Sequence, residues 1–221
     1  MTDNTPPAPS VVKTILAVVV FTLFCYCVIG LQMAVTPLFV HEKLGFNSAI
    51  AGFAVSVQYL ATFATRAGAG HRIDHKGPKY VVLVGLYAGI ACGVLIAASA
   101  YLTHWPVLAL LCVLAGRITL GFAESWVATA VIVWNIRRVG AAHTAQVISW
   151  NGVCSYGGIA LGAPIATLLY RTRDTSALTG FSGLGLLCAA LMAIGLPLAL
   201  KPPAVALLLA SQPVAARQTL N

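Results

Sequence analysis

The stretch Gly70-His71-Arg72-Ile73-Asp74-His75-Lys76-Gly77-Pro78-Lys79 concentrates charge in a chain of which only 8% of residues are charged. It separates two long apolar runs, and Gly77-Pro78 is a turn signal that ends one helix and lets another begin. The run on each side is long enough for a helix that crosses a bilayer, which needs roughly 20 mostly apolar residues. The stretch is therefore expected to be a loop between two membrane-spanning helices.

The composition of the whole chain points the same way. Of its 221 residues, 59% are hydrophobic, whereas a soluble domain is typically about 45–50% apolar and about 25% charged. The net charge of +8 would suggest nucleic acid as a partner of a soluble protein. Here the basic residues lie in short segments between apolar runs, so they are interpreted as signals of membrane orientation, and a lipid bilayer is expected as the partner in place of nucleic acid.

The apolar runs on both sides of the charged stretch predict an all-α membrane protein with six transmembrane helices. The expected spans lie within 14–40, 44–65, 80–102, 107–134, 143–170 and 176–200. Residues 11–201 would form this six-helix bundle, residues 1–10 a disordered N-terminal tail, and residues 202–221 a cytoplasmic C-terminal tail. Three glycines spaced four apart predict a close helix contact on the third span: Gly85, Gly89 and Gly93.

The distribution of Lys and Arg predicts the orientation of the bundle. An even number of spans places both termini on one side, and cytoplasmic segments carry the excess of basic residues. Arg117 lies inside a span. The side of the termini carries nine of the other basic residues: Lys13, Arg66, Arg72, Lys76, Lys79, Arg137, Arg138, Lys201 and Arg217. The opposite side carries three, Lys43, Arg171 and Arg173. Both termini are therefore expected in the cytoplasm.

Two charged residues interrupt the fourth span, Arg117 and Glu124. A charge at the bilayer centre costs about 2.5–3.5 kcal/mol even on insertion scales, so intramembrane ionisable groups are usually functional. A spacing of seven residues places both on one helix face, roughly two turns apart, and Gly121 and Ala128 share that face. The prediction is a polar stripe that binds a substrate or passes a proton; the structural alternative is a buried ion pair with other spans, or an Arg117 that reaches the interface.

Uncharged polar residues also fall inside or near the spans. Lining of a cavity and hydrogen bonding between helices are equally compatible with them. They are Gln32, Gln58, Gln146 and Asn151.

Signals for an enzyme are weak. Gly180-Phe181-Ser182-Gly183 matches the GxSG pattern of rhomboid intramembrane proteases, but the last histidine, His143, precedes this serine, and no later histidine can supply its base. The six cysteines lie inside apolar runs without a CxxC pair, which favours packing roles over a disulfide framework. No cofactor, metal centre or catalytic group is expected.

The charged stretch resembles a signature of the major facilitator superfamily, G-x-x-x-D-R-x-G-R-K, found between helices two and three. Gly70, Asp74, Gly77 and Lys79 match it, while His75 and Pro78 replace two basic positions. The resemblance implies that these four residues belong to a cytoplasmic gate, with Asp74 placed to meet the helix ends of a second bundle.

Two further matches fall on the expected helices. Arg117-Ile118-Thr119-Leu120-Gly121 resembles the family's R-x-x-x-G motif, whose arginine is associated with proton coupling. Gly158, Gly162 and Pro164 resemble the antiporter motif of helix five, G-x-x-x-G-P, with one extra residue before the proline. The segments Gly121–Ser125 and Ile148–Gly152 are similar to bacterial permeases of the arabinose-efflux type.

This resemblance implies a fold and a function. The chain is similar to the N-terminal six-helix half of the family, a 3+3 repeat, whereas members generally have two such halves with the substrate between them. The implied function is proton-coupled efflux of a small molecule across the bacterial inner membrane, with Arg117, Gly121, Glu124 and Asn151 at the cavity. The chain would pair with a second six-helix half or form a homodimer; the alternative is a transport-inactive remnant or partner of another membrane protein.

Overall fold

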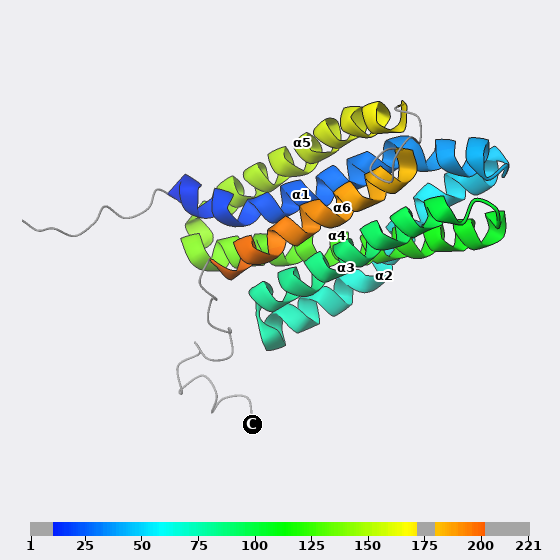
Figure 1. Cartoon of the computed structure of the whole chain (residues 1–221). Coiled ribbons are helices and arrows are strands. Elements are labelled where there is room, and N and C mark those ends of the chain that lie inside the picture. The colour runs from blue at the N-terminus through cyan, green and yellow to red at the C-terminus, as the bar shows by residue number, and fades with distance from the viewer. Residues whose placement is uncertain (1–10, 172–179, 202–221) are drawn as a thin grey trace, which may run out of the picture.

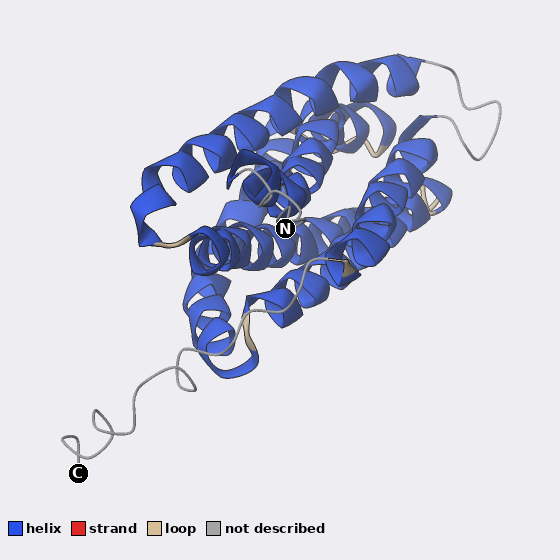
Figure 2. Ribbon diagram, turned by 90° about the vertical axis from the view of Figure 1, so that its left-hand side faces the viewer, coloured by secondary structure: helices blue, strands red, loops and turns tan. Residues whose placement is uncertain are grey.

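The computed structural model describes residues 11–171 and 180–201. The predicted tails, 1–10 and 202–221, lie outside these ranges, as do residues 172–179, which include the start of the sixth predicted span. Within the described ranges, six helices are long and apolar enough to cross a membrane, and they run side by side as a bundle (Figures 1 and 2). They are α1 (Val11–Leu38), α2 (Ser48–Lys76), α3 (Pro78–Tyr101), α4 (Pro106–Val139), α5 (Thr144–Arg171) and α6 (Gly180–Leu200). The six spans predicted from hydropathy are thereby confirmed, with shifted boundaries.

The predicted loop at Gly70–Lys79 is wrong in its extent. Helix α2 continues through Lys76, and the single residue Gly77 separates it from α3, which begins at Pro78. Gly77 has φ 84°, a conformation that glycine adopts without strain, and proline suits the first position of a helix because its missing N–H would have no helical partner there. The turn signal was placed correctly, but the charged residues before it form the last two turns of a helix.

The residues between the first two predicted spans, His41–Lys43, are also helical. Residues Phe39–Lys43 form a π-helical turn that extends α1. The next helix begins at Ser48, where the side chain of Asn47 accepts a hydrogen bond from the Ile50 N–H at 2.9 Å. This side chain satisfies one of the N–H groups that a helix N-terminus leaves unpaired.

The helices pair in a repeated pattern. Helix α1 packs along α5, α4 packs along α2, and α3 packs along both α4 and α6, so that α5 and α1 occupy one edge in Figure 1 and α2 lies at the other. The α1–α5, α2–α4 and α3–α6 pairings are those expected if α1–α3 and α4–α6 are two copies of one three-helix unit, since exchanging the units converts the first pairing into the second and the third into itself. The arrangement agrees with the predicted 3+3 repeat.

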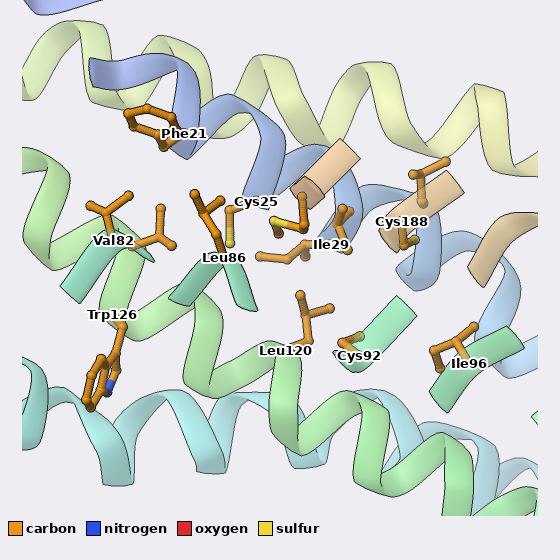
Figure 3. Packing of buried hydrophobic residues seen from close by; sticks show 14 of the residues in the cluster. Phe21, Cys25, Ile29, Val82, Leu86, Cys92, Ile96, Leu120, Trp126 and Cys188 are labelled. Carbon is orange, nitrogen blue, oxygen red and sulfur yellow. The ribbon is translucent and has the colours of Figure 1, made fainter. Parts of the chain in front are cut away.

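The glycine-rich face of α3 is a close helix contact, as predicted. A side-chain carbon at Gly85 would lie 2.7 Å from Val127 of α4, and one at Gly89 would lie 2.7 Å from Met192 of α6. Figure 3 shows Cys25, Cys92 and Cys188 among the aliphatic side chains of the core. All six cysteines are free thiols.

The contact between α1 and α5 yields a stability prediction. A side-chain carbon at Gly162 would collide with the Cys27 carbonyl and lie 2.7 Å from the Leu31 nitrogen, whereas one at Gly157 has no neighbour within 4 Å. Gly162→Leu is expected to destabilise the bundle by about 1–3 kcal/mol or more, because overpacking forces the backbones apart. Thermal unfolding in detergent measures this effect, with Gly157→Leu on the same helix as control; equal midpoints for the two variants would contradict the contact.

Candidate functional site

The polar stripe of α4 lies in the contact between α4 and α2. Arg117 is fully buried, and Glu124 is 9% exposed. Between them, a side-chain carbon at Gly121 would collide with the Gln58 carbonyl of α2, so this glycine lets the two backbones approach closely. Arg117, Gly121 and Glu124, predicted to share a face of α4, therefore do share the face that packs on α2.

Glu124 is held by neutral hydrogen-bond donors from α2. Its Oε2 accepts a hydrogen bond from the Gln58 Nε2 at 2.9 Å and lies 3.0 Å from the Thr62 hydroxyl. Gln58 and Thr62 are four residues apart, hence on one face of α2. Tyr26 of α1 lies close to the same carboxylate and to Ser155 of α5. Two further helices, α2 and α1, thus approach Glu124, and neither brings a cation into ion-pair range among the described residues.

Arg117 has far fewer partners than its five donors require. Its Nη2 donates to the Val55 carbonyl of α2 at 3.1 Å, while Nε and Nη1 are buried without a hydrogen-bond partner among the described residues. The predicted alternative of an ion pair is not seen for Arg117 in residues 11–171 and 180–201. A buried, incompletely bonded guanidinium is energetically costly, so Arg117 is not explained by a gain in stability.

Asn151 belongs to a different contact. Its Oδ1 accepts a hydrogen bond from the Thr22 hydroxyl of α1 at 2.8 Å, so it joins α1 to α5. Of the predicted helix-five motif, Gly158 and Gly162 lie on the same seam against α1. Pro164 is inside α5 and exposed. The structure therefore divides the predicted cavity residues into an α2–α4 group and an α1–α5 group.

The predicted gate residues connect the helix ends of this bundle. Asp74 faces Arg137 of α4, with 3.4 Å between its Oδ1 and the Arg137 Nη2, and Lys79 donates to the carbonyl of Leu200, the last residue of α6, at 3.0 Å. Gly77 forms the turn, and Gly70 lies within α2 with open space beside it. These contacts hold α2, α3, α4 and α6 together at one end of the bundle.

Some residues of the site were missed or left open by sequence reasoning. Thr62 and Tyr26 were not singled out, although Thr62 lies one turn after Gln58, and this pairing could have predicted a polar face on α2. For Gln58 and Asn151 the hydrogen-bonding interpretation is the one observed. Trp126 and Trp134 are buried in the core, whereas Tyr156 is 77% exposed. No cluster of three or more metal-binding side chains occurs in the described part of the chain.

Comparisons with known proteins place this geometry in context. The family model described as Major Facilitator Superfamily matches residues 18–218. An uncharacterized MFS-type transporter of Burkholderia pseudomallei (strain 1106a) is 44% identical over 200 residues, covering 89% of this chain and 48% of that protein. One of Pseudomonas aeruginosa (strain LESB58) is 49% identical over 162 residues, covering 71% of this chain and 40% of that protein.

A solved structure agrees in fold. The inward-open conformation of the xylose transporter XylE from E. coli superposes with a TM-score of 0.65 at 17% identity, covering 88% of this chain and 48% of that one. At this identity the likeness concerns the fold alone. The chain spans about half the length of the curated relatives it matches.

Proposed function

The chain belongs to the major facilitator superfamily, a family of membrane transporters, and on this premise we propose that it forms one half of a proton-coupled transporter for a small molecule. The proposal rests on the buried polar stripe of α4, Arg117 and Glu124, on a helix that is long and apolar enough to span the membrane. Ionisable groups are retained inside a membrane where they serve a substrate or a proton.

In this proposal Glu124 takes up and releases the proton. Its carboxylate is bonded by the neutral side chains of Gln58 and Thr62, so neutralising it leaves no unpaired cation beside it. Arg117 lies two turns earlier on the same face, and its Nε and Nη1 are buried without a hydrogen-bond partner among the described residues. The export direction is supported by the resemblance to arabinose-efflux permeases alone.

The other half of the transporter would pack on α2 and α5. These two helices are the least buried of the six and also the least apolar. Helices that faced lipid on their exposed sides would have to be the most apolar, because lipid offers no partner to polar groups. Their composition favours a water-filled cavity and a second six-helix bundle, which the greater length of the relatives supports.

The orientation completes the proposal. Because nine basic residues fall on one side and three on the other, we infer that both termini and the α2–α3 turn lie in the cytoplasm of a bacterium. Alkaline phosphatase, which is active only outside the cytoplasm, is expected to be active when fused after Lys43 and inactive when fused after Lys201. The reverse pattern would overturn this orientation.

Transport in two pieces tests the function. The chain is co-expressed with the part of the Pseudomonas aeruginosa relative that lies beyond its match, and membrane vesicles with an imposed pH gradient are supplied with a panel of small molecules. We expect at least one compound to collapse the pH gradient, and only when both pieces are present. If both pieces assemble and no compound moves protons, the alternative of a transport-inactive partner protein is favoured instead.

A further inference from the structure

A groove of about 510 Å³ lies on the surface of the last turns of α2. It is lined by Gly68, His71, Arg72, His75 and Lys76. These positions follow helical spacing, so they form one face of α2. Gly68, which has no side chain and open space beside it, lies at the N-terminal end of this face. Every side chain on this face is either basic or an imidazole.

The two cationic side chains are held in place by aromatic rings. The guanidinium carbon of Arg72 lies 5.0 Å from the ring centroid of Trp126, which Figure 3 shows between α4 and α2. The Lys76 ammonium lies 4.8 Å from the ring of Tyr80. Cation–π contacts of this kind restrict a long side chain without neutralising its charge. The groove therefore presents two pre-positioned cations.

The two imidazoles line the groove beside the two cations. The rings of His71 and His75 are 4.2 Å apart between centroids, and the His75 Nδ1 lies 2.9 Å from the His71 carbonyl, to which it donates. This bond orients the ring of His75 and leaves its other nitrogen available to a ligand.

Among the residues that the structure describes, no acidic side chain lines the groove. Asp74 belongs to the same helix, but its carboxylate faces Arg137 of α4. Glu124 is buried between the helices, and Glu42 lies next to α1 at the start of the α1–α2 connection. Basic residues in the last turn of a helix also complement the helix dipole, but that role requires neither the ring contacts nor the hollow beside them.

We propose that this groove binds a phosphate group, carried by an anionic lipid or by a soluble phosphate compound. Arg and Lys are the side chains that bind phosphate oxygens, Arg through a planar fork and Lys as a point charge. The groove lies where the apolar part of α2 gives way to its charged end, the level at which a lipid headgroup would meet the protein. This site is independent of the proposed proton path in α4.

The test compares the purified chain in nanodiscs with an Arg72→Gln/Lys76→Gln variant. One arm measures retention of phosphatidylglycerol against phosphatidylcholine by native mass spectrometry; the other measures the thermal midpoint in phosphatidylcholine discs with and without inorganic phosphate. The matched control, Lys43→Gln/Arg171→Gln, removes the same charge elsewhere. Binding is expected to weaken about 30-fold in the groove variant, because each basic residue at an anionic membrane surface strengthens binding roughly fivefold. The control variant is expected to bind as the wild type does.

The two arms of the experiment distinguish a lipid from a soluble source of the phosphate group. Selective loss of phosphatidylglycerol in the groove variant supports a lipid source, and loss of stabilisation by phosphate alone supports a soluble one. The proposal is overturned if wild type and groove variant bind both probes equally, or if the control variant loses binding as strongly, because bulk surface charge would then explain the effect.

Discussion

Replacing Arg117 by methionine is expected to make the bundle more stable. The side chain is fully buried, and two of its three nitrogens lack partners among the described residues. Substituting buried charged groups by apolar ones of similar size is often stabilising by about 1–4 kcal/mol. The Val55 carbonyl that loses its contact lies within α2 and keeps the backbone partner of a helical residue.

Thermal unfolding of the chain in detergent measures the effect. Arg66→Met serves as control, since Arg66 is an exposed arginine, and surface substitutions usually change stability by less than about 0.5 kcal/mol. In the two-piece assembly the same Arg117→Met variant should lose pH-driven transport. A lower midpoint for Arg117→Met than for wild type would show that the guanidinium is fully compensated in the folded protein.

The second large effect is expected at Glu124. In the two-piece assembly, Glu124→Gln should abolish proton-driven transport, by about 100-fold or more if the carboxyl carries the proton as a general acid and base does. The fold should persist, because the glutamine oxygen can still accept the hydrogen bonds from Gln58 and Thr62. Collapse of the pH gradient on substrate addition is the measurement.

A matched variant separates this role from a general loss of charge. Glu42→Gln makes the same chemical change at an exposed position in the π-helical turn after α1, and it should leave transport unchanged. Proton-driven transport that survives in Glu124→Gln would remove the proposed proton role while leaving the family and the fold intact.

Most of the fold was predictable, because the length and apolarity of a run decide whether it can span a membrane. The end of α2 was not, since the charges of His71–Lys76 suggest a loop by composition, whereas the helical hydrogen bonds continue until Gly77 takes a positive φ. Apolarity defines where a helix lies in the membrane and says little about where its backbone hydrogen bonds stop.

The site was only half predictable for a related reason. The spacing of Arg117 and Glu124 showed that they share a face, because helical geometry fixes neighbours along one chain. Which helix that face meets depends on packing between distant segments. The bonds from Gln58 and Thr62 to Glu124, more than sixty residues away in sequence, follow from that packing, as does the pairing of Asp74 with Arg137.

We expect the exposed faces of α2 and α5 to pack on a second six-helix bundle. Photocrosslinking measures this contact, with p-benzoylphenylalanine placed at Phe63 of α2 or Tyr156 of α5, which are 85% and 77% exposed. Tyr87 of α3, 62% exposed, is the aromatic control on a face left to lipid. In membranes containing both pieces, protein adducts are expected from positions 63 and 156 and not from 87; equal yields at all three would contradict the claim.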